Sequence, residues 1–174
     1  MAAFADCLRV GLETRLIPAL IALWPDYESA STYLSDVAAP MVESMGFFPV
    51  AASLNGKGQT PSEAFLVGPF DQTIAVPNRK NVPFIQLLEE AMDEWKLAGR
   101  PVVLFLAGIE RWDSPRWRDD LSAFRSFLQA NYPRLFVVLS CTKRGALDHL
   151  FLSPREPLYR EGMIVTVQKD GTLG

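Results

Sequence analysis

Pro101-Val-Val-Leu-Phe-Leu106 is the stretch of sequence that decides the fold of this chain. Its unbroken apolar run predicts a strand that is buried on both faces, which is typical of the central strands of parallel sheets. Arg134-Leu-Phe-Val-Val-Leu139 shows the same pattern. Amphipathic helices are predicted at 84–97 and 115–130, one before each of these strands. Strands that alternate with helices predict an α/β fold with a parallel sheet flanked by helices on both faces.

The preceding segments extend this alternation. Apolar residues at every fourth position predict an N-terminal helix within 1–16. The apolar run at 19–24 fits either a buried strand or the end of that helix, and periodicity does not separate the two. A helical stripe over 33–45, which Pro40 should kink or restart, leads to a strand predicted at 47–54.

The region 55–83 is rich in Gly, Pro and Asn, which predicts a long loop with a short helix at 61–66. A loop of this length in a compact domain is typical of a functional or mobile segment. Further along the chain, the pattern predicts a short helix at 145–152 and a strand at 163–168. A turn is expected to follow at Asp170-Gly171.

The composition fits a single globular domain over 1–174. The net charge of −3 argues against nonspecific binding to nucleic acid or to anionic membranes, which need a positive field. No apolar run is long enough to span a bilayer, and the start lacks the pattern of a signal peptide. Cys7 and Cys141 lie far apart without metal-ligand spacing. This favours reduced thiols in the cytoplasm, with one disulfide left open as an alternative.

Four segments carry a resemblance to a known family, and one of them, 47–54, lies where that family has the strand that follows its phosphate-loop helix. The stretch that ends in Ala107-Gly-Ile-Glu110 lies where AAA-type ATPases of the P-loop superfamily have their acidic strand. Leu135-Phe-Val-Val-Leu-Ser-Cys-Thr142 resembles their sensor strand, and 150–160 resembles the segment before their late arginine. In order and spacing, residues 17–168 are similar to this family. The resemblance implies a three-layer RecA/AAA-type core without the helical lid that usually follows it.

The phosphate loop of that family should fall at Trp24-Pro-Asp-Tyr-Glu-Ser-Ala-Ser-Thr32. Against the pattern G-x-x-x-x-G-K-[ST], Trp24 and Ser29 replace the glycines and Ala30 replaces the lysine, whereas Ser31 and Thr32 remain. The glycines let the backbone wrap phosphates, and the lysine supplies positive charge. The resemblance therefore implies that Ser29, Ala30, Ser31 and Thr32 are vestigial positions that bind no nucleotide.

Acidic residues are also misplaced for nucleotide chemistry. Asp26 and Glu28 would bring negative charge to a triphosphate, and each such contact near 4 Å costs on the order of 4 kcal/mol at an effective dielectric of about 20. Ala107 and Gly108 stand where the family has Asp-Glu for magnesium and the attacking water. Glu110 comes two residues late and should point elsewhere. We therefore expect no catalytic residues, no cofactor and no metal.

The leading hypothesis is a pseudo-ATPase, a non-catalytic protein that acts by binding another protein. The partner would be an active ATPase or a bacterial secretion, conjugation or defence complex, and a homo-oligomer is a further alternative. Trp and Arg often anchor protein interfaces, and the two latest arginines resemble those that act on a neighbour's phosphate in ring ATPases. The interaction candidates are Trp112, Trp117, Arg116, Arg118, Arg155 and Arg160.

Two other classes of function stay open. A hydrolase or nucleotide-dependent enzyme with a rebuilt site would use Ser140 or Cys141, although no cue near Cys141 favours a reactive thiol. The single histidine, His149, is expected at the surface or at the edge of the core. A nucleic-acid adaptor would use the arginines within 111–134. Three aspartates interrupt that stretch and argue against this reading.

Overall fold

The computed structural model describes residues 2–53, 66–69, 74–75, 84–96 and 99–174. The strands in this part of the chain are β1 Ala19–Leu23, β2 Phe48–Ser53, β3 Leu66–Pro69, β4 Ile74–Ala75, β5 Val102–Ala107, β6 Leu135–Cys141 and β7 Met163–Thr166. They form one sheet in the order β4-β3-β2-β5-β6-β1-β7. The five strands from β2 to β7 in this order are parallel, as predicted, and β3 and β4 extend the sheet antiparallel beyond β2.

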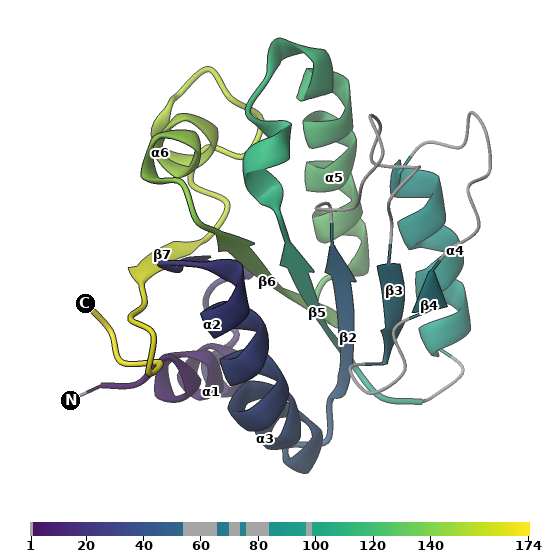
Figure 1. The fold of residues 1–174 in the computed structure, drawn as a ribbon. Coiled ribbons are helices and arrows are strands. Elements are labelled where there is room, and N and C mark those ends of the chain that lie inside the picture. The colour runs from purple at the N-terminus through teal and green to yellow at the C-terminus, as the bar shows by residue number, and fades with distance from the viewer. Residues whose placement is uncertain (1, 54–65, 70–73, 76–83, 97–98) are drawn as a thin grey trace.

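Helices cover both faces of the sheet, which confirms the predicted three layers (Figure 1). They are α1 Phe4–Thr14, α2 Tyr27–Tyr33, the π-helix Leu34–Ala38, α3 Ala39–Ser44, α4 Phe84–Lys96, the 3₁₀ turns Ile109–Trp112 and Pro115–Trp117, α5 Arg118–Asn131 and α6 Arg144–Leu152. The first three α-helices pack on one face, and α4, α5 and α6 pack on the other. None of the described helices is long and apolar enough to cross a membrane.

Two buried clusters, one on each face, explain why the central strands are apolar throughout. On β5, Val103 and Phe105 belong to the cluster under α1–α3, whereas Val102, Leu104 and Leu106 belong to the cluster under α4–α6. Because successive strand side chains point to opposite faces, a strand with helices on both sides must be apolar at every position.

The sequence left the run at 19–24 undecided between strand and helix, and the structure makes it β1. This strand lies between β6 and β7, with Ala19 opposite Val137 of β6 and Leu20 opposite Met163 of β7. The expected restart at Pro40 is also present. The π-helix before Pro40 interrupts the regular helical hydrogen bonds at the place where proline lacks an N–H to donate.

The expectation of one long loop over 55–83 is wrong where the structure describes that region. Leu66–Pro69 pairs with β2 and Ile74–Ala75 pairs with β3, both antiparallel. The short helix expected at 61–66 is wrong at Leu66, which begins β3, and 61–65 lies outside the described residues. The Gly and Pro of this region indicate loop locally, but pairing with the free side of β2 overrides that preference.

The described C-terminal residues return to the first helix. The predicted turn at Asp170-Gly171 is present, with the Gly171 N–H donating to the Gln168 carbonyl at 3.0 Å. The Gly171 carbonyl in turn accepts from the Phe4 N–H at 2.8 Å, and Thr172 pairs with Ala3 in an isolated bridge. These hydrogen bonds hold the start of α1 next to the turn that follows β7.

Candidate functional site

The connection between β1 and α2 is where a phosphate loop would lie. It consists of residues 24–26 alone, because β1 ends at Leu23 and α2 begins at Tyr27. A phosphate loop of the pattern G-x-x-x-x-G-K-[ST] needs about eight residues. Ser29, Ala30, Ser31 and Thr32 lie inside α2 and not in a loop, which corrects the expected extent of the loop.

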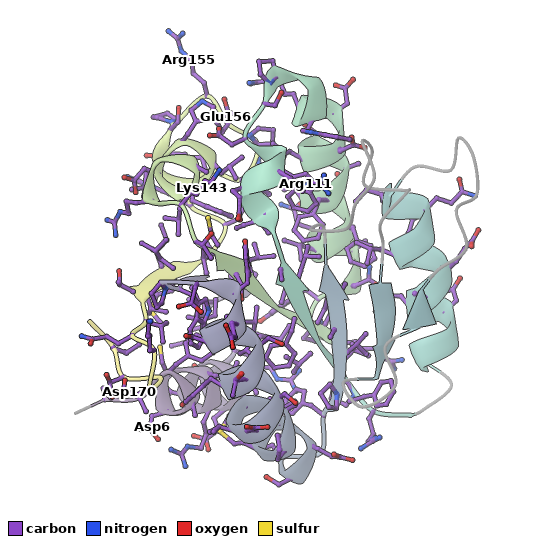
Figure 2. All side chains as sticks on the ribbon, viewed as in Figure 1. Asp6, Arg111, Lys143, Arg155, Glu156 and Asp170 are labelled. Atoms are coloured by element: carbon purple, nitrogen blue, oxygen red, sulfur yellow. The ribbon has the colours of Figure 1, made fainter. Side chains whose placement is uncertain are left out.

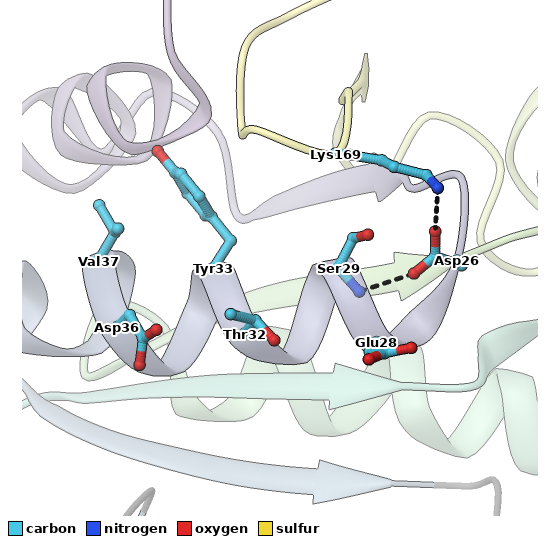
Figure 3. Close-up of a pocket in the computed structure, with 8 residues that line it drawn as sticks. All are labelled: Asp26, Glu28, Ser29, Thr32, Tyr33, Asp36, Val37 and Lys169. Atoms are coloured by element: carbon cyan, nitrogen blue, oxygen red, sulfur yellow. Dashed lines mark hydrogen bonds and ion pairs between the residues drawn. The ribbon is translucent and has the colours of Figure 1, made fainter.

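Asp26 caps the N-terminus of α2. It is the N-cap residue, and its Oδ1 accepts a hydrogen bond from the Ser29 N–H at 2.7 Å. Its Oδ2 lies 3.9 Å from the Lys169 Nζ (Figure 3). The hydrogen bonds from Ser29 lower the pKa of the Asp26 carboxyl, and Lys169 adds a smaller effect in the same direction. An ionised carboxylate thus occupies the helix N-terminus, the position that favours a bound phosphate.

A shallow pocket of about 500 Å³ follows the exposed face of α2 (Figure 3). Its charged groups are three carboxylates, Asp26, Glu28 and Asp36, against the single amine of Lys169. This net negative lining disfavours a polyanion such as a triphosphate.

A second group of side chains joins the carboxyl ends of three parallel strands. Glu110 follows β5, and its carboxylate accepts hydrogen bonds from the Tyr27 hydroxyl, at the start of α2, and from the Thr142 Oγ1, after β6, at 3.2 Å. Gly108, with φ of 86°, turns the chain from β5 into the 3₁₀ turn that carries Glu110. The expectation that Glu110 points elsewhere is therefore wrong.

This edge of a parallel sheet is where open α/β folds bind their ligands. Here Tyr27 and Glu110 lie across it and hydrogen-bond to each other. The sequence singled out Glu110 but carried no signal for Tyr27 or Thr142. Among the described residues, no group of three or more His, Cys, Asp or Glu side chains could hold a metal ion.

Removing the Tyr27 hydroxyl should destabilise the protein. Tyr27→Phe leaves the ring in place but deletes a hydrogen bond to a charged carboxylate, so we expect the free energy of unfolding to fall by about 1.5–3 kcal/mol. Urea denaturation measures the change. Tyr132→Phe is the matched control, because the Tyr132 hydroxyl bonds a neutral carbonyl, that of Arg15, on an exposed surface. An equal effect of the two substitutions would contradict the role given to Tyr27.

The candidate nucleophiles of the enzyme hypothesis, Ser140 and Cys141, are both buried in β6. Burial raises the pKa of the Cys141 thiol from 9.0 to about 11. The reactive thiolate is therefore scarce at neutral pH. Cys7 and Cys141 are both free, so the alternative of a disulfide is wrong.

The raised Cys141 pKa predicts a loss of stability in alkali. Because the folded-state pKa lies above the unfolded value, the neutral thiol favours the folded state fully below about pH 9, and this stability is lost as pH rises towards about 11. Unfolding curves from pH 8 to pH 11 should therefore fall less steeply with pH for Cys141→Ala than for the wild type. Cys7→Ala is the control for the other thiol, because burial also raises the pKa of Cys7. Parallel pH slopes for Cys141→Ala and wild type would disprove the assignment.

Trp112 is not at the surface, which corrects its role as an interaction candidate. It is 1% exposed and packs against Phe124 of α5 with ring centroids 4.9 Å apart. Trp117 is partly buried against the same cluster. The 3₁₀ turn after β5 therefore places the Trp112 side chain in the core, whereas Trp117 keeps part of its surface exposed.

Two of the arginine candidates do lie together. Arg118 and Arg155 line an open groove of about 540 Å³ between the outer face of α5 and residues 154–157, and Arg125 joins them. Arg118 pairs with Glu156 at 3.3 Å, and Arg125 pairs with Glu161 at 2.7 Å. Arg155 extends away from the fold (Figure 2).

The remaining basic candidates are dispersed. Arg160 lies over the ring of Tyr159 outside the groove, and the side chain of Arg116 lies outside the described part of the structure. Arg134 precedes β6, at the opposite edge of the sheet from the carboxyl ends. Arg118, Arg125 and Arg134 therefore do not form the single basic surface that a nucleic-acid adaptor would need.

His149 is exposed, as expected. Its Nδ1 lies 2.5 Å from the Asp113 carboxylate and its Nε2 lies 3.5 Å from the Glu156 carboxylate. Both ring nitrogens thus face acids, and neither is directed at a nucleophile of the kind that a hydrolytic triad requires.

No family model matches the chain, and no curated protein matches it. Two solved structures resemble it in fold. A Walker-type ATPase of Pyrococcus abyssi aligns with a TM-score of 0.62 and 14% identity over 95% of this chain and 52% of that one. The ORC2 protein of Aeropyrum pernix, solved in ADPNP and ADP complexes, aligns with a TM-score of 0.60 and 12% identity over 94% of this chain and 47% of that one. The chain spans about half the length of each, and it has the α/β fold of P-loop ATPases.

Proposed function

We propose that this protein is a P-loop-ATPase-like domain that hydrolyses no nucleotide and acts by binding another protein. The observation that carries the proposal is the start of α2. There the connection from β1 is three residues long, and the Asp26 carboxylate caps the helix N-terminus, where an active P-loop ATPase would hold phosphate. The substitution of Ala107 and Gly108 for metal-binding acids supports the same conclusion. Free Cys7 and Cys141 fit a reducing cytoplasm.

The test measures ATP hydrolysis and looks for nucleotide bound between β1 and α2. We expect no phosphate release from ATP and magnesium, and crystals grown with both should show no nucleotide between β1 and α2. An active P-loop ATPase assayed in parallel controls for the reagents. Ordered nucleotide at the end of β1, or hydrolysis that Asp26→Asn alters, would overturn the proposal.

The surface best suited to a protein partner is the groove between α5 and residues 154–157. Three arginines line it, and the two acids that pair with them, Glu156 and Glu161, leave a net positive charge, so it complements an acidic surface. Arg118 and Arg125 are about half exposed, at 54% and 48%. Arg155 forms no ion pair with any described residue. The partner would be an active ATPase that this chain regulates, or a component of a secretion, conjugation or defence complex.

Affinity capture from the native host tests this surface. Arg155→Glu reverses a charge in the groove and should remove the partner that the wild-type chain captures. Arg144→Glu is the charge-matched control, since Arg144 lies on α6, is 58% exposed and pairs only with Asp148 among the described residues. A partner lost equally with both variants, or with neither, would contradict the assignment to this groove.

A further inference from the structure

The opposite edge of the sheet, where the parallel strands begin, carries a second basic site. A pocket of about 430 Å³ lies there, lined by Arg15, Arg100 and Arg134, with Met92 among its apolar residues. The three arginines come from three places in the sequence, after α1, before β5 and before β6. We name it the amino-edge pocket.

Two of these guanidinium groups are held over aromatic rings. Arg15 lies 5.1 Å from the ring centroid of Phe47, and Arg100 lies 5.2 Å from that of Phe48. Arg15 also donates from Nη1 to the Pro133 carbonyl at 2.6 Å. Cation–π contact of this kind orients a guanidinium and leaves its remaining N–H groups free to donate.

Among the described residues, no acid belongs to the amino-edge pocket. Neither Asp nor Glu is among its described lining residues, and none of its three arginines forms an ion pair with a described residue. Elsewhere in the same chain, Arg118 and Arg125 are each paired with a glutamate. Like charges gathered in one cavity repel each other, and a bound anion removes that repulsion.

The charge and size of the pocket define the ligand class. Three lining arginines carry more positive charge than one carboxylate neutralises, and the planar N–H pairs of a guanidinium match phosphoryl oxygens. A volume of about 430 Å³ is in the range of small-molecule sites, and Met92 gives it an apolar wall. We propose that the amino-edge pocket binds a small anion with two or more phosphoryl groups.

Titration calorimetry of the full chain with pyrophosphate tests the proposal. We expect saturable binding that weakens at least about tenfold in Arg100→Gln and in Arg134→Gln, since each loses charge-assisted hydrogen bonds. Binding should also weaken when sodium chloride is raised from about 50 mM to about 500 mM. Arg155→Gln, on the far groove, is the matched control and should leave the affinity unchanged. Thermal unfolding of each variant verifies that it is folded.

Two further probes separate the phosphoryl ligand from other anions. Tricarballylate carries three carboxylates, and we expect it to bind at least about tenfold more weakly than pyrophosphate. Tricarballylate binding as tight as pyrophosphate would overturn the phosphoryl assignment. A single-stranded DNA oligonucleotide that binds through Arg100 and Arg134 while pyrophosphate does not would also overturn it. So would the absence of pyrophosphate binding, or binding that neither Arg100→Gln nor Arg134→Gln weakens.

Discussion

Trp112→Ala is expected to lower the free energy of unfolding by about 3–5 kcal/mol, the usual cost of truncating a buried tryptophan. The indole is fully enclosed and contacts Phe124, so alanine would leave a cavity under α5. A loss of this size is a large part of the about 5–15 kcal/mol that stabilises a typical domain. Urea denaturation followed by circular dichroism measures it.

Two variants control this experiment. Trp112→Phe keeps an aromatic ring in the cluster and should cost clearly less than the alanine variant. Leu152→Ala removes a side chain that is 52% exposed and should change stability by less than about 0.5 kcal/mol. If Trp112→Ala kept full stability while it abolished partner capture, the tryptophan would be an interface anchor, as its residue type suggests.

Gly171→Ala is expected to cost about 2–5 kcal/mol. Gly171 has φ of 86°, where a Cβ is strained by about 1–2 kcal/mol. An added Cβ would also overlap the ring of Tyr33, and overpacking typically costs about 1–3 kcal/mol. Tyr33 cannot move freely, because it packs against Phe4 and Trp24 with centroids 6.2 and 5.7 Å away. Thermal and urea unfolding of the variant measure the loss.

Gly46→Ala is the matched control for the clash. Gly46 has φ of 90°, but an added Cβ would meet nothing within 4 Å. The loss of stability in Gly46→Ala therefore measures the backbone strain alone. The additional loss in Gly171→Ala measures the clash with Tyr33. Equal losses for Gly171→Ala and Gly46→Ala would show that the turn is not packed on Tyr33.

The central strands could be predicted because the sequence of each strand indicates by itself that both of its faces are buried. Residues 102–106 and 135–139 are apolar at every position, which is the pattern that a strand between two helical layers requires. Leu66–Pro69 could not be predicted in the same way. Its strand conformation depends on pairing with β2, a contact that its own Gly and Pro do not indicate.

The site was harder to predict than the sheet, because its parts are far apart in sequence. Tyr27 and Glu110 are 83 residues apart, and Glu110 and Thr142 are 32 apart. The fold alone brings them together at one edge. The early start of α2 did have a local signal, since Asp is a usual N-cap residue, but the likeness to a phosphate loop favoured a different assignment of Asp26.

Residue type alone also misplaced Trp112, because tryptophan is common both in cores and at interfaces. The arginines of the amino-edge pocket could not be predicted as a group for a related reason. Arg15, Arg100 and Arg134 form no cluster in the sequence and line one pocket only where α1 ends and two strands begin.

The position of β1 has a consequence for the newly made chain. Ala19 of β1 pairs with Val137 of β6, so β1 cannot join the sheet until the ribosome has added 118 further residues. At translation speeds of about 5–20 residues per second, that delay lasts roughly 6–24 s. During this delay the partner strand of β1 does not yet exist, so the apolar side chains of Leu20, Ile21 and Trp24 stay exposed to solvent. A chaperone that shields residues 19–24 on the ribosome should therefore raise the yield of folded protein.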